Sequence, residues 1–109
     1  MHIHTKGWLA EWATVAYLSL CGYRIVRRNS QIAGVEVDIL AKKADQLVVV
    51  EVKWRKTWDG ADMAITPTQR KRLQKAMNAI ASKAYTDTVR LDVVYWVAQW
   101  PFVRHVQDA

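Results

Sequence analysis

The feature of this 109-residue chain that most constrains its fold is the apolar run LVVVEVK at residues 47–53. An apolar, β-branched run of this length predicts a buried strand. Side chains alternate along a strand, so Glu51 and Lys53 share one face with Val49. Unpaired charges are costly inside a protein, so two charges at the end of a buried strand require a partner, a metal ion or a catalytic role.

Length and composition predict a single domain spanning residues 1–109, because the chain can form one core and 51% of its residues are apolar. No apolar run approaches the roughly 20 residues of a membrane span, and the first six residues lack the apolar region of a signal peptide. Cys21 is the only cysteine. We therefore expect a cytoplasmic protein without an internal disulfide or a membrane span. The net charge of +6 favours a polyanionic partner, either nucleic acid or a membrane surface.

A first helix is predicted over residues 5–21, with Gly22 as the residue that ends it. Its apolar positions form two stripes, one of Leu9, Trp12, Ala13, Ala16 and Leu20 and one of Trp8, Val15 and Leu18. Glu11 falls within the second stripe. Its carboxylate either points inward or reaches a basic partner or solvent, as single charges on helices usually do.

A second helix is predicted to begin at Thr66 and Pro67, as N-cap and first helical residue. Its apolar side comprises Leu73, Met77, Ile80, Ala81 and Ala84. Basic residues in its first turns form either a solvated face or a phosphate-binding surface: Arg70, Lys71, Arg72 and Lys75. Gln69 stands three residues after Thr66, which also matches a capping box.

The strands are predicted at residues 23–28, 35–41, 47–53, 89–97 and 102–106, with turns at Asn29-Ser30 and at residues 43–46. Residues 55–65 are predicted as a loop. The second and third strands form an antiparallel hairpin. If Lys42 faces Leu47 across its loop, the pairs that follow are Leu40 with Val49, Asp38 with Glu51 and Glu36 with Lys53. This register gathers four charged side chains on one face of the hairpin.

Two carboxylates that converge from adjacent strands form a hard oxygen site of the kind that binds Mg²⁺ or Mn²⁺. Such an ion polarises a phosphodiester and lowers the pKa of an attacking water. Lys53 would stabilise the developing charge, and Glu11 would be a further ligand or a base through water. The alternative is a buried ion-pair network without a metal, in which Lys53 relieves the repulsion between Asp38 and Glu51.

These residues resemble the YraN-like family, uncharacterised protein family 0102, from Gly7 to about Ala109. The matching segments are Glu11 with Ala13, Gly22-Tyr23, Arg28-Asn29, residues 36–40 (EVDIL), residues 50–53 (VEVK) with Arg55, Thr66-Pro67, Arg72-Leu73, residues 92–94 (DVV) and residues 103–106 (VRHV). Each segment is weak by itself. The order Glu, Asp, then Glu-x-Lys in these contexts is more specific.

That family is similar to the PD-(D/E)XK nuclease superfamily, and in particular to archaeal Holliday-junction resolvases. The resemblance implies an α/β, restriction-endonuclease-like fold, with a mixed central sheet flanked by helices. It implies a divalent metal held by Glu11, Asp38, Glu51 and the carbonyl of Val52, with Lys53 as the catalytic lysine. It also implies a homodimer.

The chain departs from the family pattern at three places. Ala10 replaces a glycine within the first helix, Val35 separates Gly34 from Glu36, and Gln69 stands where lysine is common. The Val35 difference concerns the entry of the chain into its strand, and Gln69 removes a basic phosphate contact. Each metal ligand that the resemblance implies is present.

The function that these features favour is a metal-dependent endonuclease acting on branched, single-stranded or otherwise structured DNA. Its phosphate contacts would come from Arg55, Lys56, Gln69, Arg70, Lys71 and Arg72. Trp54 and Trp58 either stack on unpaired bases or simply pack within the protein. The alternatives are a non-catalytic nucleic-acid-binding protein that retains the nuclease fold, and a structural or interaction protein with a relic charge cluster.

Overall fold

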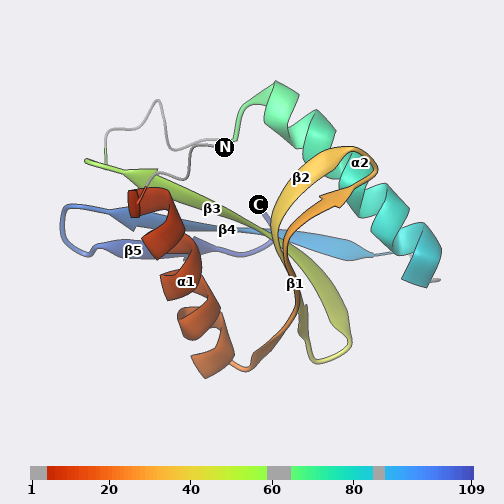
Figure 1. Cartoon of the computed structure of the whole chain (residues 1–109), viewed down its shortest axis with the longest axis horizontal. Coiled ribbons are helices and arrows are strands. Elements are labelled where there is room, and N and C mark those ends of the chain that lie inside the picture. Colours follow the sequence, from red (N-terminus) through yellow and green to blue (C-terminus); the bar gives the residue numbers. More distant parts are fainter. Residues whose placement is uncertain (1–4, 59–64, 85–87) are drawn as a thin grey trace.

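The computed structural model describes residues 5–58, 65–84 and 88–109. The elements in these residues are α1 (Thr5–Leu20), β1 (Tyr23–Ile32), β2 (Val35–Lys43), β3 (Gln46–Arg55), α2 (Pro67–Ala84), β4 (Val89–Val97) and β5 (Val103–Val106) (Figure 1). The five strands form one sheet in the order β1-β2-β3-β4-β5. Only β3 and β4 are parallel among the described strands, and α2 lies in the connection between them. The predicted mixed α/β fold is confirmed.

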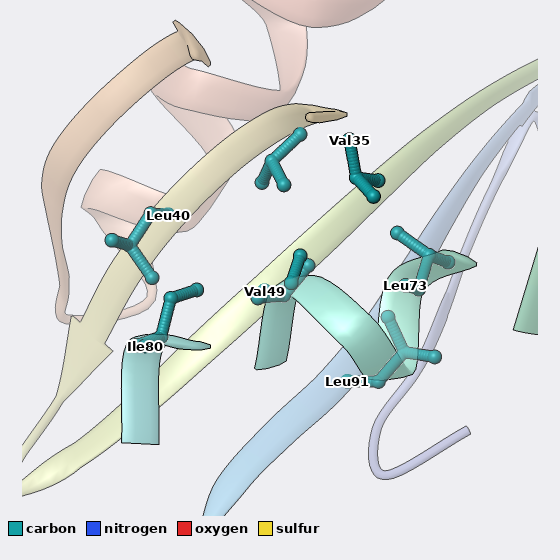
Figure 2. Close-up of a cluster of buried hydrophobic side chains, with 8 residues drawn as sticks. Val35, Leu40, Val49, Leu73, Ile80 and Leu91 are labelled. Carbon is teal, nitrogen blue, oxygen red and sulfur yellow. The ribbon is translucent and has the colours of Figure 1, made fainter. Parts of the chain in front are cut away.

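The two helices cover opposite faces of the sheet. Neighbouring valines of β3 show this, because they pack in different hydrophobic clusters, one with α1 and one with α2. Val49 packs on the α2 side with Val35, Val37, Leu40, Leu73, Ala76, Ile80 and Leu91, as Figure 2 shows for the six labelled residues of this cluster. Val48 and Val50 pack on the α1 side with Leu18, Tyr23, Ile39, Ala41 and Val94. The strand predicted from the run at residues 47–53 is therefore buried on both faces. Neither described helix is long and apolar enough to cross a bilayer.

α1 packs on the sheet with Leu18 and Val15 of its second predicted stripe, and not with its first predicted stripe. Leu9, Trp12 and Leu20 of the first predicted stripe are 53%, 43% and 89% exposed. The buried positions are instead Ala10, Thr14 and Leu18. Thr14 tolerates burial because its hydroxyl donates to the Ala10 carbonyl (2.6 Å) and accepts the indole N–H of Trp96 (2.7 Å). A polar residue therefore occupies the centre of the helix–sheet contact.

The ends of the helices follow the predicted signals. α1 ends at Leu20, and Gly22 has a φ of 87°, the left-handed conformation that favours glycine. At the start of α2 the capping box forms in both directions. The Gln69 N–H donates to the Thr66 hydroxyl, and the Thr66 N–H donates to the Gln69 side-chain oxygen, each at 3.1 Å. Pro67 is the first residue of α2, as predicted.

The first turn of the sheet is predicted in the wrong place. Asn29 and Ser30 do not turn the chain, because β1 continues to Ile32 and the reversal falls at Ala33 and Gly34. Asn29 has a φ of 49° within the strand. It stands between Arg28 and Ser30, which pair with Ile39 and Val37, so Asn29 lies opposite Asp38 of β2. Asparagine tolerates this left-handed conformation better than most residues.

The hairpin of β2 and β3 has the predicted register at its closed end and opens at the other. Leu40 pairs with Val49 and Lys42 with Leu47, as predicted. The ladder stops at Ile39 and Val50, so the predicted pairs Asp38–Glu51 and Glu36–Lys53 do not form. β2 continues instead in its pairing with β1, where Glu36 lies opposite Gln31. We call this divergence of β2 from β3, beyond Ile39 and Val50, the sheet fork.

Candidate functional site

A pocket of about 240 Å³ lies at the sheet fork and is lined mainly by polar side chains. Its walls come from β2, β3 and the first turns of α2: Val35, Glu36, Asp38, Glu51, Gln69, Arg72 and Leu73. The fork thus places Asp38 and Glu51 in one pocket without placing them in one ladder pair. The α2 residues bring a cationic side chain to the same rim.

Asp38 occupies the fork itself. Its Oδ2 accepts the backbone N–H of Val52 at 2.9 Å, so the carboxylate replaces the ladder partner that β2 would have provided. Burial raises the pKa of Asp38 to about 6, against the opposing effect of the Val52 N–H. The carboxylates of Glu11 and Glu36 add to the rise and the charge of Lys53 reduces it. Asp38 is therefore an acid held close to other acids in a poorly solvated position.

Glu51 stands one residue beyond the end of the β2–β3 ladder, on the α2 side of the sheet. Burial raises its pKa to about 7, and the nearby Asp38 carboxylate adds to the rise. The cations of Lys53 and Arg72 oppose it. The Lys53 side chain is buried at 6% exposure, and its ammonium lies 3.4 Å from the side-chain oxygen of Gln69. The charges of Glu51 and Lys53 thus lie close enough to influence each other within the protein.

Glu11 reaches toward the same acids from α1. Its Oε1 is buried and has no hydrogen-bond partner among the described residues. Burial raises the pKa of Glu11, the side chains of Arg28 and Asn29 oppose the rise, and Glu36 adds to it. Glu11 acts on the pKa of Asp38, and Asp38 acts on that of Glu51. Asp38 is thus the carboxylate whose charge is linked to both Glu11 and Glu51.

Arg28 and Asn29 are the residues of this region that the sequence did not single out for a role. The Arg28 guanidinium lies 4.0 Å from the ring centroid of Trp12, a cation–π contact that holds it beside Glu11. Asn29 approaches Glu11 from a strand position that the sequence predicts as a turn. The only signal for either residue was the Arg28-Asn29 pair within the family resemblance.

The donors at the fork fit a small divalent ion that keeps part of its water shell. Within the described residues, no three Asp, Glu, His or Cys side chains lie together closely enough to hold one ion. Asp38 and Glu51 can act as a pair, since Mg²⁺ is commonly bound through one or two carboxylates with water completing its shell. Their raised pKa values also fit, because a cation would relieve the repulsion between them.

Of the predicted phosphate contacts, Gln69 and Arg72 line this pocket. Arg72 lines it and is exposed, as are Lys56, Arg70 and Lys71. The Arg70 guanidinium also donates to the Ala109 carbonyl at 3.1 Å. Arg55 and Gln69 are half-buried. The exposed cations can therefore meet a polyanion without leaving a packed position.

The metal-free protein is expected to lose stability as the pH rises from about 4 to about 7. The raised pKa values of Asp38 and Glu51 mean that the folded state holds more protons than the unfolded state in this window. Their contribution is full below the unfolded pKa values and is lost as pH passes the folded ones. Urea unfolding in EDTA at about pH 5 and about pH 8 measures the fall. Glu51→Gln is expected to reduce this fall, and an equal fall in both proteins would contradict the cause.

A second polar cluster lies in the sheet beneath α1 and was not predicted from the sequence. Asp92 is fully buried and accepts hydrogen bonds from Arg90 (2.8 and 3.0 Å), His105 (2.8 Å), Tyr23 (3.0 Å) and the Asp108 N–H (3.1 Å). The other ring nitrogen of His105 bonds the hydroxyl of Tyr17 at 2.9 Å. Both ring nitrogens of His105 therefore have a partner.

The fold and the pocket define an α/β protein with a half-buried pair of carboxylates beside a buried lysine. A family profile and the sequences of known proteins both match most of the chain, and they agree on one family. The profile of Uncharacterised protein family UPF0102 matches residues 10–95. A UPF0102 protein of Methylocella silvestris is 41% identical over 107 residues, covering 95% of this chain and 86% of that protein. UPF0102 proteins of Sinorhizobium fredii and Paramagnetospirillum magneticum are 36% and 37% identical, each covering 95% of this chain and, respectively, 87% and 85% of those proteins.

The chain belongs to Uncharacterised protein family UPF0102. This is the family whose resemblance the sequence motifs indicated. The names of these relatives describe no activity. The roles of the site residues are therefore inferred from the chemistry of their side chains.

Proposed function

We propose that this protein is a metal-dependent endonuclease of the PD-(D/E)XK class, hydrolysing phosphodiester bonds in branched or otherwise structured DNA. The observation that carries the proposal is the grouping at the sheet fork. Asp38 and Glu51 share one pocket, their pKa values are raised to about 6 and about 7, and the buried Lys53 acts on both. Gathering two half-buried carboxylates and a buried lysine where β2 and β3 diverge is costly unless the site has a function.

The proposed metal site uses Asp38, Glu51 and the backbone carbonyl of Val52 as ligands for Mg²⁺ or Mn²⁺. When bound, such an ion would act as a Lewis acid and lower the pKa of the water molecule that it binds. Lys53 stabilises negative charge on the phosphate as the water oxygen bonds to phosphorus and the bond to the leaving sugar oxygen breaks. Glu11, with its unpartnered Oε1, would accept the proton of that water or complete the ligand set through water.

The proposed DNA contacts surround the pocket on its α2 side and beyond the end of β3. Arg72 lies on the rim, next to Arg70 and Lys71 in the first turns of α2. Arg55, the last residue of β3, is half-buried, and Lys56 directly after it is exposed. The proposed contacts thus place cations outside the pocket and carboxylates within it. Backbone phosphates would be held by the first group, and the scissile phosphate would lie at the second.

We further propose that two copies pair through the outward face of α1, which is Leu9, Trp12, Ala16 and Leu20. These residues are exposed, and residues 12–20 contain no charged side chain. A helix that is apolar on its solvent side requires a partner. A second copy fits because residues 12–20 of α1 add no charged side chain to a contact between two chains of net charge +6. Sedimentation velocity is expected to show a dimer that Leu20→Lys converts to monomer; a monomeric wild type would contradict this pairing.

The proposed activity is tested with Mn²⁺ on duplex, single-stranded, flap and four-way DNA of matched sequence. Wild-type protein is expected to cleave at least one of these substrates, and both Asp38→Ala and EDTA are expected to abolish the cleavage. Asp45→Ala is the matched control, because Asp45 is an exposed aspartate in the turn between β2 and β3. It is expected to cleave like the wild type.

The other outcomes contradict the proposal in separable ways. DNA binding without cleavage of any substrate, unchanged in Asp38→Ala and Lys53→Ala, would indicate the non-catalytic nucleic-acid-binding protein. Cleavage that persists in Asp38→Ala would place the activity at another site or in a contaminant. Absence of both binding and cleavage would leave the structural or interaction protein as the best account.

A further inference from the structure

Two aromatic side chains at the turn between β4 and β5 are exposed without a packing role in the described structure. Trp100 is 81% exposed and Phe102 is 52% exposed. Their ring centroids are 6.0 Å apart with an interplanar angle of 86°. We call this pair the aromatic tip. The hairpin that carries it forms one end of the sheet, at the left in Figure 1. Exposure of two large apolar rings side by side indicates a contact surface.

The aromatic tip is held rigidly by Trp58. The indole N–H of Trp58 donates to the carbonyls of Gln99 (3.1 Å) and Trp100 (2.9 Å), and its backbone N–H donates to the Gln99 side chain (3.1 Å). The Phe102 N–H closes the turn on the Gln99 carbonyl at 2.7 Å. Trp58 itself packs on the cluster of Val93, Tyr95 and Val97. Trp58 therefore holds the backbone of the turn that carries the tip, which lowers the entropy lost on binding.

The surroundings of the aromatic tip are positively charged. Arg55 adjoins the turn, because its carbonyl accepts the Ala98 N–H at 3.2 Å. Arg55 and Arg104 both oppose the rise that burial causes in the pKa of Tyr95, so both guanidinium groups lie near that strand. Residues 93–107 contain no acidic side chain. Exposed aromatic rings among cations are the combination that binds single-stranded nucleic acid.

We propose that the aromatic tip stacks on an unpaired base of the DNA substrate while the adjoining arginines hold its phosphates. This inference rests on the proposed nuclease function and specifies the substrate feature that the protein recognises. Strand rise places Arg55 about 13 Å beyond Glu51 along β3. That distance corresponds to roughly four nucleotides of a DNA strand. The aromatic tip would therefore stack on unpaired bases that lie a few nucleotides from the phosphate at the carboxylate pair.

The test compares a forked DNA with a fully paired duplex of the same sequence, in EDTA so that no cleavage occurs. The fork carries oligothymidine arms, and one arm has 2-aminopurine near the branch point, whose fluorescence is quenched when it stacks on an aromatic ring. Trp100→Ala is expected to weaken fork binding about tenfold and to abolish the quenching, with little effect on duplex binding. Trp100→Phe is expected to restore much of both. Val26→Ala is the control, because Val26 is an exposed apolar residue on β1.

Each alternative outcome separates this inference from the nuclease proposal. Equal loss of fork and duplex affinity in Trp100→Ala, or wild-type quenching in that variant, would overturn stacking while leaving the carboxylate site untouched. A change in sedimentation of Trp100→Ala with unchanged fork affinity would show that the tip contacts protein instead. A wild type that cleaves through Asp38 but does not prefer the fork over the duplex would also overturn the inference. A wild type that binds neither DNA would overturn both proposals.

Discussion

Replacing Lys53 with alanine is expected to slow phosphodiester cleavage by about 100- to 1,000-fold, the usual effect of removing one group that stabilises transition-state charge. Lys53 is the buried cation of the carboxylate site. It is 6% exposed, and its charge lowers the pKa values of both Asp38 and Glu51. Its removal leaves the carboxylates without their buried counter-charge. Single-turnover cleavage with saturating protein measures the chemical step apart from DNA binding.

Two further variants make the Lys53 experiment interpretable. Lys53→Met keeps the apolar stem and removes the charge, so it is expected to be as inactive as Lys53→Ala while packing better. Lys83→Ala removes an exposed lysine at the far end of α2 and is expected to cleave normally. Circular dichroism checks that both Lys53 variants are folded. Wild-type rates in a folded Lys53→Ala protein would end its assignment as the catalytic lysine.

Asp92→Ala is expected to be the most destabilising single change outside the apolar core, with a loss of about 3–5 kcal/mol in the free energy of unfolding. Asp92 is fully buried and is the common acceptor for Arg90, His105 and Tyr23. Its loss leaves buried donors without a partner. Because a domain of this kind is stable by only about 5–15 kcal/mol, the variant is expected to unfold at much lower urea concentration or to be recovered unfolded.

The pH dependence of this cluster has the opposite sign to that of the fork. Burial raises the pKa of Asp92, but hydrogen bonds from Arg90, His105 and the Asp108 N–H outweigh it and lower the pKa overall. Its contribution to stability is thus present above the unfolded pKa and is lost as the pH falls below about 4.

Asp45→Ala is the matched control for Asp92→Ala, with an expected change in the free energy of unfolding within about 0.5 kcal/mol. A wild-type urea midpoint for Asp92→Ala would show that the cluster contributes nothing to stability.

The sequence predicted those parts of the fold that depend on local patterns. The run at residues 47–53 is a buried strand, Thr66 and Gln69 form the capping box, and Gly22 follows the end of α1. The predicted strand at residues 89–97 has the bounds of β4. The register Leu40–Val49 also followed, because the length of a hairpin loop fixes the pairing next to it.

The sheet fork could not be predicted in this way. Extending a register assumes that both strands keep pairing, whereas Asp38 captures the Val52 N–H at the point where β2 follows β1 away from β3. The left-handed Asn29 opposite Asp38 is likewise set by contacts across the sheet. The prediction that Glu36 faces Lys53 is wrong for this reason, although Glu36 still lines the pocket.

Residues that meet from distant parts of the chain were missed for the same physical reason. Asp92 lies between apolar neighbours in β4, and apart from Arg90 of the same strand its side-chain partners come from β1 and β5, which no local pattern marks. In α1, apolar spacing pointed to Leu9 and Leu20, yet Thr14 occupies the contact because Trp96 satisfies its hydroxyl. Part of the predicted loop at residues 55–65 lies outside the described residues.

The most direct test of the central claim is calorimetric titration of Mn²⁺ into the metal-free protein, since it examines the carboxylate pair without DNA or cleavage. The wild type is expected to show saturable binding that is lost in both Asp38→Asn and Glu51→Gln and retained in Asp45→Ala. Binding that survives in both variants, or a wild type that binds no Mn²⁺ at millimolar concentration, would contradict the account.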